Sequence, residues 1–326
     1  MLLKDNLLYY ALVSFLLLAA ELFYFWIAGK YGIMDRPNER SSHVRPAIRG
    51  GGIVFIIAVV SWFGSHEFSL PWFMLGVSTI AFISFLDDLI TVKPVIRILI
   101  QIVSVLLMFY QIWPISWPMY LLVIAVVVSV GALNTFNFMD GVNGITGVYA
   151  FVSLCSFGYI HTQLVLFTDI SLILVVSISV LIFLFFNFRI QARCFAGDIG
   201  SITIAFILIF FLIQLIQETN NFLWPLLFLV YGTDSIVTII YRIKNGENIV
   251  EPHRTHLFQY LSNELMWTHR SVSLTYGIIQ AIINLVLFVS LPYQNLFFPL
   301  MVAVLFVGSY FIVRITVIRK IQKSVV

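Results

Sequence analysis

Three carboxylates in this sequence lie beside segments that are apolar enough to cross a membrane. Asp87 and Asp88 are adjacent in FLDDL, and Asp198 follows a glycine in CFAGDIGS. An ionised side chain at the bilayer centre costs roughly 2.5–3.5 kcal/mol on insertion scales, so membrane proteins keep such groups for sites and pathways. Mg²⁺ usually binds one or two carboxylates together with substrate phosphates. The three acids therefore predict chemistry on a phosphorylated substrate.

The Asp87-Asp88 pair is followed by two cations, Lys93 and Arg97. Adjacent residues of a helix point about 100° apart, so the two acids cannot share one partner symmetrically. We expect one acid to face a substrate while a cation holds the other. The alternative is a solvated helix end with a basic flank.

A polar run, GALNTFNFMDGVNGITG, occupies residues 131–147. Asn134 and Asn137 are three residues apart and share a helical face, and Asp140 and Asn143 follow in a glycine-rich break. Buried polar side chains are costly without partners, so these four are candidate substrate contacts. Simple helix capping is the alternative.

Two glycine-containing segments add further candidates. Asp198 and Ser201 open an apolar span, where Asp198 could bind a cation or simply cap the helix. Upstream, Arg45 and Arg49 precede the run Gly50–Gly52. A basic, glycine-rich loop that opens a helix can cradle an anion, although positive-inside anchoring with a flexible turn explains it equally well.

The segment EPHRTHLFQYL carries His253, Arg254 and His256. Its His-x-x-His spacing lacks the glutamate of zinc proteases, so phosphate recognition by donors such as Arg254 fits better. Asp234 lies within a nearby apolar span, where a buried acid is a functional candidate. Three lone histidines have no polar cluster around them in sequence and receive no role: His66, His161 and His269.

The composition explains what must position these residues. Of 326 residues, 61% are hydrophobic and 10% charged, with a mean hydropathy of +1.02. Lipid offers the backbone no hydrogen-bond partner, so the long apolar segments must be helices. We predict an all-α, polytopic integral membrane protein with about 10–11 transmembrane helices. The expected spans are 7–28, 50–66, 71–87, 95–112, 117–134, 144–162, 170–187, 199–217, 222–241, 272–291 and 296–314.

Basic residues predict the orientation of these helices. All eighteen lysines and arginines except Lys4 lie on one face or at its helix ends. This places the N-terminus outside and the C-terminus in the cytoplasm. Residues 1–326 are expected to form one transmembrane domain, and the cytoplasmic loops that carry its polar chemistry are 29–49, 88–94, 135–143, 188–198 and 242–271. The net charge of +3 follows from this sorting and does not indicate nucleic-acid binding.

Taken in order, these segments resemble the polyprenyl-phosphate N-acetylhexosamine-1-phosphate transferase superfamily, glycosyltransferase family 4. The resemblance runs from about residue 34 to 261 and preserves the order and membrane face of the motifs. The form PHRTHLFQ is similar to the bacterial branch that initiates O-antigen and capsule synthesis. It lacks the triple histidine of the peptidoglycan branch.

The resemblance implies a role for each motif. Asp198 and Asn137 match the Mg²⁺ site, with Mn²⁺ as a substitute, and Phe195 matches the aromatic that stacks on uracil. Asp87 matches the acid closest to the lipid phosphate, and Asp88 supports it. The implied catalytic residues are Asp87, Asp88, Asp198, His253, Arg254 and His256. The implied substrate contacts are Asn134, Asn137, Asp140, Asn143, Phe195, Lys93, Arg97, Arg45 and Arg49, of which the last two depart somewhat in spacing.

The implied reaction transfers HexNAc-1-phosphate from UDP-GlcNAc or a 6-deoxy relative to undecaprenyl phosphate, with release of UMP. It would be the first membrane step in making a cell-surface polysaccharide, at the cytoplasmic face of the inner membrane. The family also suggests homodimers. A phosphomonoester has a second pKa of about 6, so the lipid phosphate is mostly dianionic at pH 7 and can attack directly. The rival route passes through a phosphorylated Asp87.

Two other functional classes remain open from the sequence. A polytopic transporter would also carry polar residues among its spans, although usually near the midplane of paired repeats. An aspartate-rich membrane prenyltransferase would likewise use Mg²⁺ and a diphosphate. The isolated Asp87-Asp88 pair, without a wider acidic repeat, favours the sugar-phosphate transferase.

Overall fold

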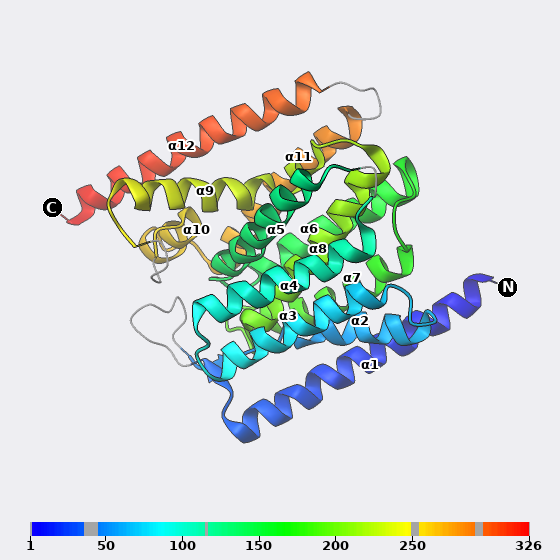
Figure 1. Ribbon diagram of the computed structural model, residues 1–326. Helices are drawn as coiled ribbons and strands as arrows, with labels where there is room; N and C mark the ends of the chain where they lie inside the picture. The colour runs from blue at the N-terminus through cyan, green and yellow to red at the C-terminus, as the bar shows by residue number, and fades with distance from the viewer. Residues whose placement is uncertain (1, 36–44, 115–116, 249–253, 291–295, 326) are drawn as a thin grey trace.

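The computed structural model describes residues 2–35, 45–114, 117–248, 254–290 and 296–325. Long helices run side by side, with α1 at one edge and α12 at the opposite edge, and the two chain ends lie at opposite ends of the bundle (Figure 1). The main helices are α1 (Leu2–Tyr31), α2 (Ile53–Ser65), α3 (Pro71–Leu89), α4 (Pro94–Ile112), α5 (Met119–Met139), α6 (Ile145–Tyr159), α7 (Ile170–Asn187), α8 (Gly197–Thr219), α9 (Leu229–Lys244), α11 (His269–Ser290) and α12 (Phe297–Val325).

These eleven helices coincide with the eleven predicted spans, so the all-α polytopic fold is confirmed. Nine helical segments of the described chain are long and apolar enough to cross a membrane. The other two are α2, with 13 residues, and α6, with 15 residues, which continues into a π-helical turn, η1 (Ile160–Leu164). The prediction ended the fifth span too early, since α5 continues to Met139.

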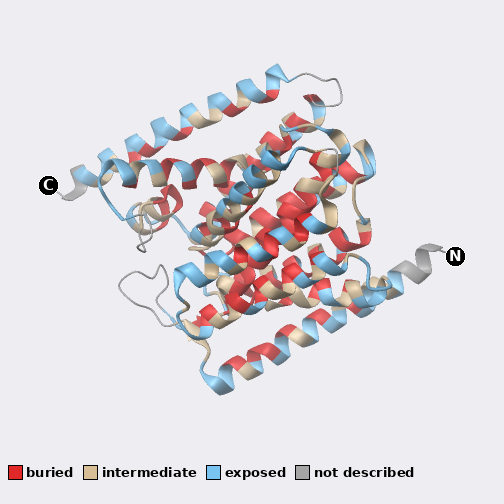
Figure 2. Ribbon diagram, viewed as in Figure 1, coloured by how far each residue is buried: buried red, intermediate tan, exposed pale blue. Residues whose placement is uncertain are grey.

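Helix α8 forms the centre of the bundle. Nearly all of its apolar length is buried, and Figure 2 shows it enclosed by its neighbours. It packs against α3 and α5, and the rings of Phe73 and Phe210 stack with centroids 4.0 Å apart. A helix that is apolar on every side needs such surroundings, so the start of α8 is fixed in place.

The helix that follows α8 is interrupted. A short 3₁₀ segment, η2 (Trp224–Phe228), precedes α9 and leaves backbone groups without regular helical partners. The buried Gln280 of α11 satisfies two of them: its Oε1 accepts from the Val230 N–H at 3.0 Å, and its Nε2 donates to the Leu226 carbonyl at 3.0 Å. The break is therefore stable inside the bundle.

A small sheet connects the segment before α2 to the segment before α8. Strand β1 (Met34–Asp35) pairs antiparallel with β2 (Ala47–Ile48), and Ile48 forms a parallel bridge with Cys194. The N–H groups of Gly51 and Gly52 then donate to the carbonyls of Phe195 and Ala196, at 2.8 and 3.1 Å. The interpretation of these glycines as an anion cradle was wrong, because their amides are used in this pairing.

The glycines serve close packing instead. A Cβ atom on Gly52 would lie 2.1 Å from the Cα of Gly200, and one on Gly197 would lie 2.5 Å from a carboxylate oxygen of Asp88. Gly197 also has a φ of +71°, which side-chain-bearing residues rarely adopt. The start of α8 can approach the 50–52 segment only because neither side carries a side chain.

We predict that Gly52→Ala destabilises the protein severely, because its methyl group meets backbone rather than a flexible side chain; overpacking typically costs about 1–3 kcal/mol or more. The matched control is Gly64→Ala in α2, where a Cβ would meet nothing within 4 Å. Thermal unfolding in detergent measures both. An unfolding temperature of Gly52→Ala equal to that of Gly64→Ala contradicts the packing role.

Candidate active site

The carboxylate of Asp88 lies where three segments meet. Its Oδ1 accepts from Arg49 Nε at 2.7 Å and from the Asp198 N–H at 3.0 Å, and its Oδ2 accepts from the Ile199 N–H at 3.0 Å. The side chain is fully buried. Asp88 therefore caps the positive N-terminus of α8, and its negative charge is balanced by Arg49. The alternative reading of Asp198 as the helix cap is excluded.

Asp87 and Asp198 converge on Arg97. Arg97 Nη1 lies 2.6 Å from Asp87 Oδ2 and 3.6 Å from Asp198 Oδ2. Asp87 Oδ1 also accepts from the Val92 N–H at 2.7 Å, and the Asp87 and Asp198 carboxyl groups are hydrogen-bonding neighbours. Asp87 thus pairs with Arg97, one of the two cations expected from the sequence. Asp88 pairs with Arg49, which the sequence did not indicate as a partner.

The two asparagines of α5 face different neighbours. Asn137 Oδ1 accepts from the Ser201 hydroxyl at 3.0 Å, one helical turn beyond Asp198. Asn134 instead donates to the buried Gln101 of α4 at 2.8 Å. Asn137 therefore lies beside the acid cluster, whereas Asn134 joins α5 to α4.

A second group of predicted residues lines a cavity of about 350 Å³. Phe195, Asn143 and Arg45 contribute to its wall, and Arg45 Nη1 donates to Gln191 at 2.9 Å. Further lining residues, which sequence reasoning did not select, include Arg189, His269 and Arg270. Among the described residues, the charged side chains that line it are arginines and none is an acid, so the cavity suits an anionic ligand with a flat ring.

Two asparagines, Asn143 and Asn187, hold the backbone around this cavity through hydrogen bonds. Asn143 Nδ2 donates to the Arg189 carbonyl at 3.0 Å, and the Asn143 N–H donates to His269 Nδ1 at 3.3 Å. Asn187 Oδ1 accepts from the Gly144 N–H at 2.6 Å, and its Nδ2 donates to the Cys194 carbonyl at 2.8 Å. The loop that carries Phe195 is therefore anchored at both ends.

His256 lies in a separate buried network. Its Nδ1 is 3.0 Å from Asp234 Oδ1, which also accepts from the Leu257 N–H at 3.2 Å. Tyr276 donates to the other Asp234 oxygen at 2.5 Å, and Arg314 of α12 donates to the Thr255 carbonyl at 2.7 Å. The segment that carries His256 leads into α10 (Leu257–Gln259), and side chains of α9, α11 and α12 contribute to the network around it.

The remaining predicted site residues lie in different surroundings. Lys93 is exposed just before α4, and Arg254 is half-buried. His253 lies outside the described residues. Asp140 accepts from the Thr146 hydroxyl at 2.6 Å. Burial raises the pKa of Asp140 to about 6.

All three histidines to which no role was given have polar partners, and His161 Nδ1 accepts from the Phe167 N–H at 3.4 Å. His269 borders the cavity, as described above. His66 lies at the opposite end of the bundle, where its Nε2 is 2.8 Å from the Ser171 hydroxyl and 3.8 Å from Asp169. No periodicity connects His269 or His66 with its distant partner along the chain, because each pair is separated by a hundred residues or more.

The acid cluster is small for a metal centre made by protein alone. Among the described residues, no three His, Cys, Asp or Glu side chains group to hold a metal ion. Two carboxyls, Asp87 and Asp198, do converge with Asn137 close by. Mg²⁺ is commonly held by one or two carboxylates and completed by substrate phosphates, so this oxygen set fits such an ion when substrate is bound.

A family model described as glycosyl transferase family 4 matches residues 70–216, which contain the acid cluster, Asn137 and Phe195. The chain is similar to this family over the segment that carries most of the acid cluster's surroundings. A Bacillus subtilis protein described as a probable undecaprenyl-phosphate N-acetylglucosaminyl 1-phosphate transferase is 28% identical over 257 residues, covering 72% of this chain and 71% of that one. The Escherichia coli (strain K12) undecaprenyl-phosphate alpha-N-acetylglucosaminyl 1-phosphate transferase is 26% identical over 261 residues, covering 71% and 69%.

We predict that Asp140→Asn stabilises the protein at neutral pH. Because the folded-state pKa of about 6 exceeds the ordinary 3.8, ionisation of Asp140 opposes folding, and stability falls as pH rises between these values. The variant should gain on the order of 1–3 kcal/mol above pH 6 and nothing near pH 4. Unfolding temperatures of both proteins across this range provide the measurement. A difference that does not vary with pH contradicts the assignment.

Proposed function

We propose that this protein transfers an N-acetylhexosamine-1-phosphate from a UDP-sugar to undecaprenyl phosphate and releases UMP. The observation that carries the proposal is the adjacency of the two sites. Phe195 lines the basic cavity, and Asp198, three residues later, enters the acid cluster. A nucleotide with its base beside Phe195 would place its diphosphate near Asp198 and Arg97. The names of the relatives, which specify undecaprenyl phosphate and N-acetylglucosaminyl 1-phosphate transfer, support the same reaction class.

Asp198, Asp87 and Asn137 would hold the Mg²⁺ ion of this reaction. The ion would supply positive charge to the donor diphosphate and make its phosphorus more electrophilic. The chain's own contribution is positioning, which dominates in phosphoryl transfer. Asp88 contributes by fixing the first turn of α8, and Arg97 contributes by holding Asp87 toward Asp198.

The geometry favours direct attack by the lipid phosphate over a phosphorylated aspartate. Both oxygens of Asp87 already accept hydrogen bonds, from the Val92 N–H and from Arg97. A bond from an Asp87 oxygen to phosphorus would withdraw negative charge from the carboxyl group and weaken both of these charge-assisted contacts. We assign Asp87 to orienting Arg97 and the acceptor phosphate, with Lys93 as a second cation at the surface.

We further propose that the acid cluster faces the cytoplasm of a bacterial inner membrane. The basic residues gather at this end of the helices, as positive-inside sorting requires, and a cytoplasmic nucleotide sugar can reach it directly. An O-antigen or capsule polymer is the expected downstream product class.

The decisive test incubates purified protein in detergent with undecaprenyl phosphate, Mg²⁺ and a panel of UDP-N-acetylhexosamines while UMP is measured. We expect UMP release that EDTA abolishes and that Mg²⁺ or Mn²⁺ restores. Asp198→Asn should lower kcat at least about a hundredfold, as the loss of a key electrostatic contact does. Glu218→Gln, at the far end of the same helix, is the matched control and should retain activity.

The products distinguish the remaining classes. Pyrophosphate in place of UMP identifies a prenyltransferase. A folded protein that releases neither product but moves a substrate across vesicles identifies a transporter. Either result overturns the proposed reaction.

The cavity assignment has its own test. We predict that Phe195→Ala raises KM for the UDP-sugar about tenfold or more, because stacking on a base contributes about 1–3 kcal/mol, while KM for the lipid stays the same. Phe195→Tyr should preserve the stacking and serves as the control. Equal increases in both KM values would show general damage to the site instead.

A further inference from the structure

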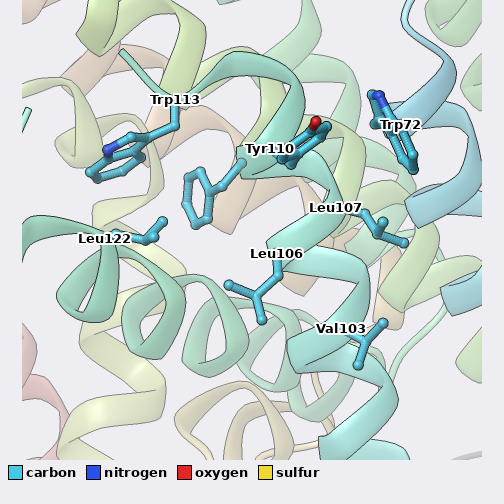
Figure 3. Close-up of a pocket in the computed structure, with 8 residues that line it drawn as sticks. Trp72, Val103, Leu106, Leu107, Tyr110, Trp113 and Leu122 are labelled. Atoms are coloured by element: carbon cyan, nitrogen blue, oxygen red, sulfur yellow. The ribbon is translucent and has the colours of Figure 1, made fainter. Parts of the chain in front are cut away.

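Two hollows of this protein offer different groups to a ligand. One, of about 640 Å³, lies along α4 and is lined by apolar and aromatic side chains, among them Trp72, Leu106 and Tyr110 (Figure 3). None of the described residues that line it is charged. The other is the basic cavity of about 350 Å³ beside Phe195, where His269, the first residue of α11, forms part of the wall. An imidazole ring both donates and accepts hydrogen bonds, so His269 offers a ligand there a second kind of polar contact, beside the charged arginines.

The Asn143 backbone fixes the tautomer of His269. Its N–H donates to His269 Nδ1 at 3.3 Å, and since a backbone amide can only donate, Nδ1 carries a lone pair and the ring proton lies on Nε2. A second proton would place an N–H against this amide and a positive charge beside the arginines of the wall, Arg45, Arg189 and Arg270. His269 is therefore held as a neutral ring whose Nε2–H is a hydrogen-bond donor.

The same helix also fixes the position of this ring. One turn further along α11, the buried Ser273 hydroxyl lies 2.8 Å from the Asn143 carbonyl oxygen and 2.9 Å from the His269 carbonyl oxygen, and can donate to either. The Asn143 side chain donates to the Arg189 carbonyl at 3.0 Å. Because the ring and the wall are attached to each other, the direction of the Nε2–H bond is set before a ligand binds, which lowers the entropic cost of using it.

We propose that His269 is a further contact of the donor substrate, and that its Nε2–H donates to an oxygen of the nucleotide. The inference rests on the proposed function, which takes the nucleotide to lie in this cavity beside Phe195. The arginines of the wall attract anions in general, whereas a neutral N–H with a fixed direction requires an oxygen at one place. A carbonyl oxygen of uracil and an oxygen of the diphosphate share this chemistry.

Two substitutions separate contact with the ligand from support of the wall. In His269→Asn, the amide oxygen takes the place of Nδ1 and can accept from the Asn143 N–H, but the donor at Nε2 is lost. In His269→Gln, the amide nitrogen takes the place of Nε2 and keeps a donor there, but the acceptor at Nδ1 is lost. We expect KM for the UDP-sugar to rise about tenfold in His269→Asn, the loss of one hydrogen bond, and to stay close to the original value in His269→Gln.

KM for undecaprenyl phosphate should stay the same in both variants. His66→Asn, at the opposite end of the bundle, is the matched control and should leave both KM values unchanged. The opposite order overturns the proposal: a KM that rises in His269→Gln and not in His269→Asn would mean that the ring only holds the Asn143 backbone. Unchanged values in both variants, or equal increases for the UDP-sugar and the lipid, overturn it as well.

Calorimetry without lipid separates this inference from the proposed reaction and locates the acceptor oxygen. Uridine and UDP are titrated into the protein in detergent, with and without His269→Asn. Weaker binding of both ligands assigns the acceptor oxygen to the nucleoside, and weaker binding of UDP alone assigns it to the diphosphate. A protein that binds UDP through His269 but releases no UMP in the transfer assay sustains the contact and refutes the reaction. UMP release with equal affinity for UDP in both proteins refutes the contact alone.

Discussion

The arrangement of this site depends on one buried carboxylate, that of Asp88. It accepts hydrogen bonds from Arg49 and from two amides at the start of α8. It thus ties together the end of α3, the segment before α2 and the first turn of the central helix. A charge-assisted bond from Arg49 and the positive helix end together compensate a charge that would otherwise be costly inside the bundle. The neighbouring acid, Asp87, is left to face Asp198.

The same first turn of α8 serves both halves of the site. Phe195 precedes it and borders the cavity, Asp198 lies in it, and Ser201 follows and contacts Asn137. Because α8 is enclosed by other helices, this turn cannot shift without displacing its neighbours. The glycines at 50–52, 197 and 200 make this rigidity attainable, since they let two backbones approach to a distance that side chains would prevent.

The sequence predicts the helical framework well because each span is marked by its own apolar length and needs no distant partner. It also predicts that Asp87, Asp88, Asp198 and Arg97 act together, because membrane cost alone singles out these acids. The sequence does not predict the contacts between residues that lie far apart along the chain. Arg49 meets Asp88 across 39 residues, and Asn143 meets His269 across 126. Such contacts follow from how helices pack, which no local periodicity encodes. The burial of His256 against Asp234 was equally hidden, as was the π-helical end of α6.

The short length of α2 determines how far the site lies from the end of the neighbouring helix α1. The C-terminal end of α2 lies level with the start of α1, where Tyr9 contacts Ser65. The 13 residues of α2 cover about 20 Å, whereas α1 has 30 residues, so the N-terminal end of α2 stops well short of the end of α1. Tyr24, whose hydroxyl donates to the Arg49 carbonyl, still has seven residues of α1 beyond it, about 10 Å of helix. Arg49 and Asp88 consequently lie short of the end of α1, about 10 Å from it along the helix. An acceptor phosphate beside Asp87 and Arg97 would then lie at a depth that its chain reaches from the bilayer, so the proposed reaction would require no extraction of the acceptor from the membrane.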